Sequence, residues 1–129
     1  MRSVQPLPAV LVVDDTPSIQ QLLLHTLRDL VPYDLVAVDD ATAALAVLAA
    51  RPVPLVITDY HLSDMRGDAL VAEIKAASPT TKVLMITADV GVDGSEEWLD
   101  VDRCLIKPFP LHELVSAVRT LLPSNERAR

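Results

Sequence analysis

Five polar or charged residues follow directly on short apolar runs, and three of them are carboxylates. The five are Asp14, Asp15, Asp59, Thr87 and Lys107. Three carboxylates that lie close together raise one another's pKa unless a cation neutralises them. Mg²⁺ is a suitable cation, because it typically binds one or two carboxylates, a carbonyl oxygen and several waters. The sequence therefore predicts a Mg²⁺ site if the fold brings these residues together.

Asp14 and Asp15 are adjacent, which restricts how both could serve one ion. Neighbouring residues on an extended strand point to opposite sides, so the two carboxylates can share an ion only where the strand turns into a loop. One would contact the ion directly and the other through water. A pair of acids before a helix also commonly serves as a cap and dipole partner, so the pair alone does not decide between these roles.

The apolar pattern predicts the elements that position these residues. β-rich apolar runs recur at residues 9–13, 35–38, 55–58, 82–87 and 104–106, and each precedes a segment that could be helical. Strands that are apolar throughout are expected when helices cover both faces of a sheet through right-handed crossovers. The prediction is an α/β fold with a doubly wound, five-stranded parallel sheet.

Periodic apolar residues and capping residues mark the helices between these strands. The first helix would bury a face that includes Leu22, and the last helix a face that includes Leu111. Thr16 is expected to be the N-cap of the first helix and Asp40 that of the second. Residues 88–102 contain two glycines and little periodicity, which predicts an atypically short fourth helix.

In open parallel sheets, ligands bind outside the carboxyl ends of the strands. The five residues named at the outset all end or follow a predicted strand, so they would share one edge of the sheet. Asp39 and Asp40 follow the second strand, which is expected to lie to one side, and they are left out of the site. The gathering of five such groups at one edge favours a binding site over a helix cap.

Four stretches of sequence, in order along nearly the whole chain, are "VLVVDDTPS", "LVITDYHLSDMRGDAL", "VLMITAD" and "CLIKPF". They resemble the response regulator receiver domains of two-component signalling. The resemblance implies a flavodoxin-like strand order of 2-1-3-4-5. It also implies that Asp59 accepts a phosphoryl group from a phosphohistidine, and that Mg²⁺ is held by Asp14, Asp15, Asp59 and the backbone carbonyl of His61.

The same resemblance assigns supporting roles to other residues. Thr87 and Lys107 would contact the phosphoryl oxygens. Gly67 matches a glycine of the loop after the phosphorylated aspartate, where a positive φ favours glycine, and the small Ala88 would leave access to the site. Transfer to a carboxylate needs in-line approach and cancellation of charge, which a metal ion and a lysine supply. Contacts made in the phosphorylated state only can bias a two-state equilibrium.

Such a domain would be a signalling phosphoacceptor and not an enzyme, catalysing only its own phosphorylation and dephosphorylation. The expected partners are a sensor histidine kinase or a histidine phosphotransfer protein, and a downstream protein target. The sequence is compatible both with a standalone regulator and with a receiver of a hybrid sensor kinase. One alternative is a degenerate receiver that acts as a constitutive protein-interaction module.

A second alternative is a Mg²⁺-dependent phosphohydrolase with an aspartyl nucleophile, as in the haloacid dehalogenase family. That chemistry requires a second aspartate two residues after the first. Here the corresponding residues are His61 after Asp59 and Thr16 after Asp14, so the sequence argues against it.

Three positions depart from the receiver pattern. Cys104 stands where the family usually has a switching aromatic residue, and we expect a buried, inert thiol there in preference to a redox sensor. Ser63 replaces a frequent proline, which would loosen the loop after Asp59. His61 could tune attack of water on a phosphoaspartate or be a solvent-exposed bystander.

Composition limits the remaining possibilities. With 129 residues, the chain is expected to be a single domain over residues 1–129, with flexible ends at 1–8 and 124–129. A net charge of −7 and a pI near 4.7 argue against nucleic-acid binding. The sequence offers no bilayer-length apolar run and no apolar signal segment. The single cysteine excludes an internal disulfide. From these three features together we expect a cytoplasmic protein without membrane insertion.

Overall fold

The computed structural model describes residues 7–88 and 101–122, in which helices and strands largely alternate. The strands are β1 Ala9–Val13, β2 Asp34–Val38, β3 Leu55–Asp59, β4 Lys82–Thr87 and β5 Arg103–Ile106. The helices are α1 Pro17–Leu27, α2 Ala41–Ala50, α3 Gly67–Ala77 and α4 Leu111–Leu121. Each predicted strand is present, with its bounds shifted by at most one residue.

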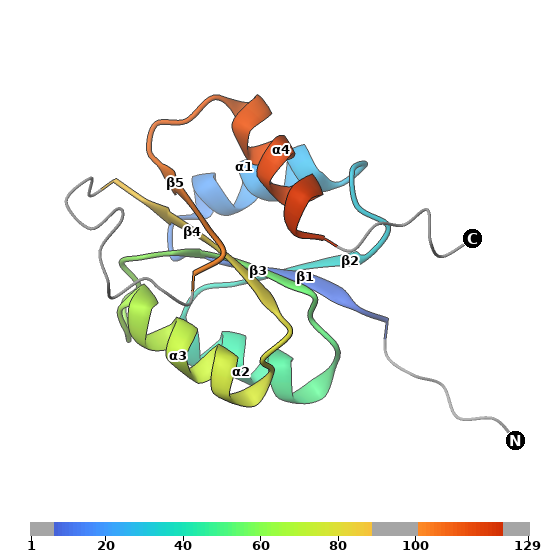
Figure 1. Ribbon diagram of the computed structural model, residues 1–129. Helices are drawn as coiled ribbons and strands as arrows, with labels where there is room; N and C mark the ends of the chain where they lie inside the picture. The colour runs from blue at the N-terminus through green and yellow to red at the C-terminus, as the bar shows by residue number, and fades with distance from the viewer. Residues whose placement is uncertain (1–6, 89–100, 123–129) are drawn as a thin grey trace, which may run out of the picture.

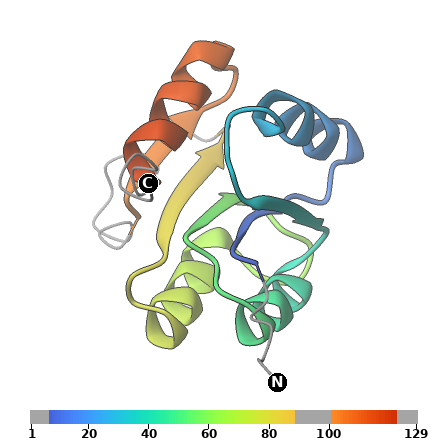
Figure 2. The same cartoon turned by 90° about the vertical axis from the view of Figure 1, so that its right-hand side faces the viewer.

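The five strands form one parallel sheet in the order β2-β1-β3-β4-β5, which confirms the predicted fold class and strand order. Helices α1 and α4 cover one face of the sheet, and α2 and α3 cover the other (Figures 1 and 2). The short fourth helix was predicted within residues 88–102, and residues 89–100 of that segment lie outside the described part of the chain. Residues 1–6 and 123–129, which include most of the predicted flexible ends, also lie outside it.

Two hydrophobic cores flank the sheet, and the central strands contribute to both. In β1, Val10 and Val12 join the core under α1 and α4, whereas Leu11 and Val13 join the core over α2 and α3. Every residue of β1 and of β3 is buried. This double burial is the reason that the central strands are apolar at consecutive positions and not at alternate ones.

Two leucines predicted to face the core are exposed. Leu22 is 41% exposed and Leu111 is 45% exposed. In α1 the fully buried stripe consists of Leu23 and Leu27, one turn apart, and Leu22 lies beside it. Leu111 is the first residue of α4, ahead of the turn in which Leu114 enters the core. The buried faces of these helices are therefore narrower than the apolar spacing predicts.

Both predicted N-caps occupy their positions, with different hydrogen bonding. The side chain of Asp40 accepts a hydrogen bond from the backbone N–H of Ala43, 2.9 Å away. Thr16 is the N-cap of α1 and precedes a proline, but its side chain makes no capping bond. Its backbone N–H instead donates to Oδ1 of Asp14 at 2.8 Å. The start of α1 is thus tied to the acidic turn that precedes it.

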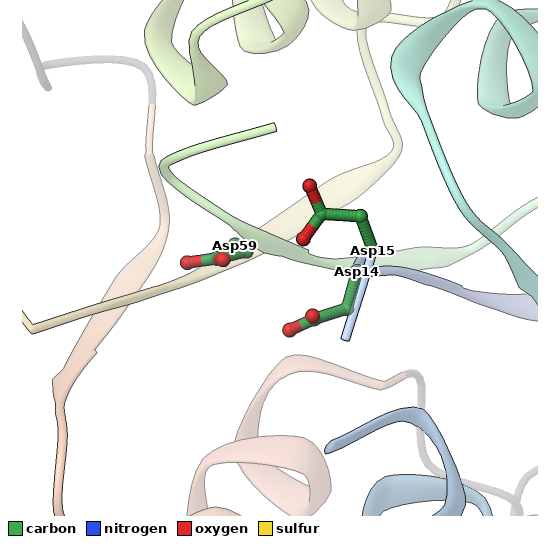
Figure 3. Close-up of side chains that lie close together, drawn as sticks. All are labelled: Asp14, Asp15 and Asp59. Carbon is green, nitrogen blue, oxygen red and sulfur yellow. The ribbon is translucent and has the colours of Figure 1, made fainter. Parts of the chain in front are cut away.

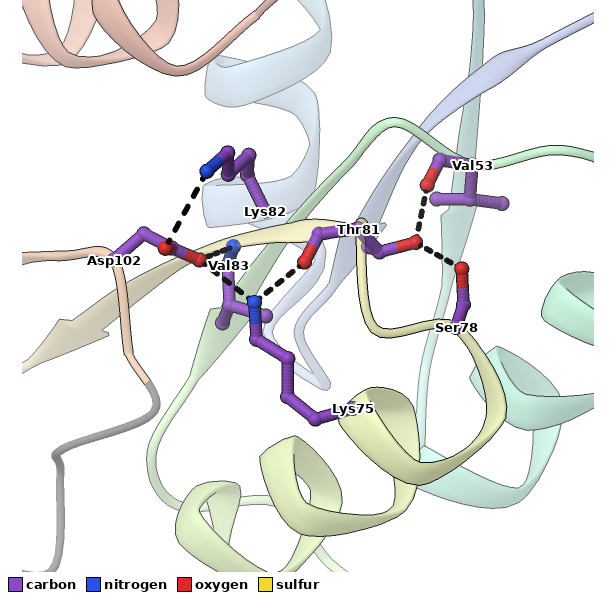
Figure 4. A network of polar contacts seen from close by, with 7 residues as sticks. All are labelled: Val53, Lys75, Ser78, Thr81, Lys82, Val83 and Asp102. Atoms are coloured by element: carbon purple, nitrogen blue, oxygen red, sulfur yellow. Dashed lines mark hydrogen bonds and ion pairs between the residues drawn. The ribbon is translucent and has the colours of Figure 1, made fainter.

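A polar network lies at the amino ends of β4 and β5 (Figure 4). Asp102 Oδ2 accepts hydrogen bonds from Lys75 Nζ at 3.0 Å and from the backbone N–H of Val83 at 2.8 Å. Lys75 also donates to the carbonyl of Thr81. These contacts join the entry of β5 to α3 and β4. They lie at the opposite edge of the sheet from the strand ends that carry the acidic residues.

None of the helices in the described part of the chain is both long and apolar enough to cross a bilayer.

Candidate phosphoacceptor site

The five residues singled out in the sequence meet at the carboxyl edge of the sheet. Asp14 and Asp15 follow β1, which ends at Val13. Asp59 and Thr87 are the last residues of β3 and β4, and Lys107 follows the end of β5. Because all the strands are parallel, their carboxyl ends lie on one side. Sheet topology thus brings together residues that are up to 93 positions apart.

The carboxylates of Asp14, Asp15 and Asp59 form a cluster (Figure 3). Each provides an oxygen, and these oxygens lie within 4.8 Å of one another. Asp14 is 1% exposed and Asp59 is 9% exposed, whereas Asp15 is exposed to solvent. Hard carboxylate oxygens at this separation match the ligands of a hard divalent cation. The cluster could hold a metal ion.

Burial raises the pKa of the Asp14 carboxyl, and the nearby carboxylates of Asp59 and Asp15 raise it further. The hydrogen bond from the Thr16 N–H and the charge of Lys107 act in the opposite direction. The net effect is a raised pKa, so Lys107 and the Thr16 N–H do not fully offset the cost of burying this carboxylate beside two others. A cation bound at the cluster would supply further positive charge.

Lys107 places a positive side chain beside Asp59, the phosphoacceptor candidate. Its Nζ lies 3.7 Å from Oδ1 of Asp59, longer than a usual hydrogen bond but within reach of an ion pair. Its backbone N–H donates to the carbonyl of Thr87 at 2.7 Å, which fastens the end of β5 to the end of β4. Thr87 is fully buried at this position. The hydroxyl and the ammonium therefore come from adjoining strand ends.

Gly67 is required for packing, and the predicted positive φ was wrong. It is the first residue of α3 and does not occupy the left-handed region. A Cβ at this position would lie 2.8 Å from Cα of Tyr60, 2.9 Å from Sδ of Met85 and 3.0 Å from the carbonyl oxygen of Asp59. Its N–H donates to the carbonyl of Tyr60 at 2.6 Å. The glycine thus allows α3 to begin against the backbone that carries Asp59.

The three residues at which the sequence departs from the receiver pattern, and the small Ala88, differ in their exposure to solvent. His61 is exposed; its ring stacks edge-on against Tyr60 with 4.8 Å between centroids, and its backbone pairs with Arg66. Ser63 and Ala88 are exposed. Cys104 is partly buried in β5 and packs against the core over α2 and α3, so it is less enclosed than expected.

Gln20 supports the site and was missed in the sequence. Its Nε2 donates to the backbone carbonyls of Asp14 at 2.6 Å and Val38 at 3.0 Å, and to Oδ1 of Asp39 at 2.8 Å. It therefore ties the acidic turn after β1 to the end of β2. The sequence carried no signal that singled it out, because the adjacent Gln21 is the same residue type in the same helix.

Residues 10–119 match the family model described as the response regulator receiver domain. The chain belongs to this family. Receiver domains are signalling modules of two-component systems and not classical enzymes. The match confirms the resemblance seen in the four sequence stretches, and the arrangement of the strands agrees with it.

The sequence is similar to those of two curated relatives. It is 37% identical over 111 residues to the response regulator protein FleR of Pseudomonas aeruginosa, covering 84% of this chain and 23% of FleR. It is 32% identical over 122 residues to the sensor histidine kinase RcsC of Salmonella typhi, covering 93% of this chain and 12% of RcsC. The chain therefore spans less than a quarter of the length of either relative.

One similar solved structure is that of the response regulator protein TrrA from Thermotoga maritima in complex with Mg²⁺-BeF. It is similar with a TM-score of 0.82 at 27% identity, covering 89% of this chain and 99% of the other.

Proposed function

We propose that Asp59 accepts a phosphoryl group from a phosphohistidine in a Mg²⁺-dependent reaction, and that the phosphorylated receiver changes its binding to a partner. The observation that carries this proposal is the cluster of Asp14, Asp15 and Asp59, with Lys107 Nζ 3.7 Å from Asp59. Asp59 offers a carboxylate nucleophile. A cation held by the three carboxylates, together with the ammonium of Lys107, would neutralise charge on the transferred group.

The residues that would hold Mg²⁺ are Asp14, Asp15, Asp59 and the backbone carbonyl of His61. The mutual approach of the three carboxylates and the raised pKa of Asp14 fit a divalent cation. When bound, the ion would neutralise charge on the oxygens of the transferred group. The Mg²⁺-BeF complex of TrrA, a relative of similar fold, supports this choice of metal.

The chain's own residues would perform the transfer. A carboxylate oxygen of Asp59 attacks phosphorus in line with the leaving group, and a P–O bond forms as the P–N bond to the donor histidine breaks. The electron pair of that bond returns to the imidazole nitrogen. Lys107, already beside Asp59, and the hydroxyl of Thr87 would then contact the phosphoryl oxygens. These contacts exist only in the phosphorylated state, so they can shift the receiver between two conformations.

The proposed phosphodonor is a sensor histidine kinase or a histidine phosphotransfer protein, and the proposed output is contact with a downstream protein. We propose a cytoplasmic receiver domain over residues 1–129, either standing alone or belonging to a hybrid kinase, which catalyses only its own phosphorylation and dephosphorylation. With a net charge of −7, we expect no direct binding to nucleic acid. No specific observation favours the degenerate receiver or the phosphohydrolase.

The decisive experiment is incubation with acetyl phosphate and Mg²⁺, followed by intact mass and peptide mapping. We expect one phosphoryl adduct on Asp59 in the wild type and none in Asp59→Asn. Asp39→Asn is the matched control, because it removes an acid at the same sheet edge but keeps an acceptor for Gln20. Equal labelling of Asp59→Asn and the wild type, or no labelling of the wild type, would overturn the proposal.

A further inference from the structure

Asp64 lies in the loop of residues 60–66, between β3 and α3, and contacts a different helix. Its Oδ1 accepts a hydrogen bond from the backbone N–H of Ala41 at 2.9 Å. Its Oδ2 accepts from the backbone N–H of Thr42 at 3.0 Å and from the Thr42 hydroxyl at 2.8 Å. An exposed side chain five residues after Asp59 is therefore anchored by three hydrogen bonds to the start of α2.

These bonds supply what α2 lacks in its own sequence. The first turn of α2 contains no acidic residue, and the side chain of its N-cap Asp40 accepts from the N–H of Ala43, one residue beyond Thr42. The N–H groups of Ala41 and Thr42 have no partner within a helix, and a carboxylate is favoured by the helix dipole at this end. The hydrogen bond from Ala41, followed by that from the Thr42 hydroxyl, lowers the pKa of Asp64. The carboxylate form thus makes the contact.

The loop that carries Asp64 is closed at its base by other contacts. The N–H of Gly67 donates to the carbonyl of Tyr60, and His61 pairs with Arg66 in an antiparallel bridge. The tip has no proline, since Ser63 stands at the position before Asp64, and a serine leaves φ unrestricted. The hydrogen bonds of Asp64 therefore restrain the tip in place of a stiff residue.

The same end of α2 also connects to the acidic turn after β1. Asp39, two residues before α2, accepts from Gln20, and Gln20 donates to the carbonyl of Asp14. The junction of β2 and α2 is thus attached to both segments that carry proposed metal ligands. Asp64 makes the attachment on the side of His61.

We propose that Asp64 is a positioning residue, whose hydrogen bonds to the start of α2 hold the 60–66 loop so that the carbonyl of His61 faces the carboxylate cluster. The part that concerns the metal rests on the proposed function. The part that concerns the loop rests on the contacts of Asp64 alone.

The test compares Asp64→Asn with a control substitution, Asp29→Asn, which removes the same charge. Asp29 is exposed and lies beyond the end of α1. Mg²⁺ is titrated by calorimetry without a phosphodonor, and amide exchange of residues 60–66 is followed by mass spectrometry without Mg²⁺. We expect about tenfold weaker Mg²⁺ binding in Asp64→Asn, as for loss of a group that orients a ligand. Exchange should accelerate in residues 60–66 and at the start of α2, and both readouts should stay at wild-type values in Asp29→Asn.

A second substitution keeps the test valid if Asp64→Asn does not fold. Thr42→Ala removes one of the three hydrogen bonds and leaves both backbone donors in place, so both readouts should change in the same direction by less. Asp64→Glu should restore part of the Mg²⁺ affinity. A general loss of stability would instead accelerate exchange throughout the sheet, and that pattern would count against a positioning role.

The outcomes separate this inference from the proposed function. If the wild type binds Mg²⁺ and is phosphorylated while Asp64→Asn matches it in affinity and loop exchange, the role of Asp64 is refuted and the proposed function stands. If the wild type binds no Mg²⁺ and accepts no phosphoryl group, the proposed function and the metal part of the inference fail. Loop exchange in the metal-free proteins then still decides whether Asp64 holds the loop.

Discussion

Replacing Gly67 with alanine tests how α3 is seated against the strand that carries Asp59. An added Cβ would lie 2.8 Å from Cα of Tyr60 and 3.0 Å from the carbonyl oxygen of Asp59. Both are backbone atoms and cannot rotate away. Sδ of Met85, at 2.9 Å, belongs to a flexible side chain, but Met85 is fully buried and has little space to move.

Two opposing effects decide the sign of the change in stability. Alanine is favoured over glycine in a helix by about 1 kcal/mol, which would stabilise α3. Overpacking of a filled site typically costs about 1–3 kcal/mol, and here two of the three contacts are with backbone. We therefore expect Gly67→Ala to lower the free energy of unfolding by about 1–2 kcal/mol. Urea denaturation of the metal-free protein measures this difference.

Ala72→Gly is the matched control, because Ala72 is exposed within the same helix. It should lose about 1 kcal/mol through helix propensity alone, which calibrates the favourable part of Gly67→Ala. If Gly67→Ala is as stable as the wild type or more so, the close approach of α3 to Tyr60 and Asp59 does not constrain the fold as argued. Unchanged Mg²⁺ binding in a destabilised variant would show that the strain is absorbed by α3 and not by the backbone of Asp59.

Three further predictions follow from the charges and contacts of the described residues. Burial raises the pKa of Asp14 in the folded protein, so folding favours the protonated carboxyl. The stability that this protonation contributes is fully present below the unfolded pKa, near 3.9, and is lost as pH rises through the folded pKa. Asp14→Asn, which keeps an acceptor for Thr16, should therefore be more stable than the wild type at pH 7 without Mg²⁺ and lose this advantage in acid; urea unfolding at several pH values measures it. Lys107→Met should slow phosphorylation by acetyl phosphate by about 100-fold or more, as for removal of a group that stabilises developing charge, and an unchanged rate would exclude that role. Asp102→Ala removes a partly buried hydrogen-bond acceptor of the Val83 N–H and an ion pair with Lys75 that is partly open to solvent, so unfolding should become easier by about 1–2 kcal/mol, with no change in Mg²⁺ affinity by calorimetry.

The strands and the site edge were predictable because each depends on local sequence. Consecutive apolar residues in β1 and β3 reflect burial on both faces of the sheet. Once the strands are parallel, the residues that follow them must gather at one edge, and Asp14, Asp59 and Lys107 do so. The exposure of Leu22 was not predictable from spacing, since the width of the buried stripe on α1 depends on how the helix sits against its neighbours.

The supporting contacts of the site were not visible in the sequence for a different reason. Asp64 binds residues that precede it by 22 and 23 positions, and Gln20 reaches 18 and 19 positions ahead to Val38 and Asp39. No local pattern marks a side chain that bonds to a distant backbone. Gly67 shows the same limit, because its position was recognised while its reason lies in the packing of Tyr60 and Met85 around it.

Charge explains why a divalent ion, and not Lys107 alone, should complete this site. The three carboxylates and one ammonium leave two negative charges at the strand ends, which a single divalent cation would cancel. In the proposed reaction the single charge of Asp59 is replaced by a phosphoryl group with about −1.5 to −2 charges, so the site becomes more negative than the cation balances. Among the described residues, Lys107 and Thr87 are the groups proposed to contact the added phosphoryl oxygens, and they adjoin each other at the ends of β5 and β4. Phosphorylation should therefore draw these two strand ends toward Asp59, and this displacement is the physical signal that a partner could detect.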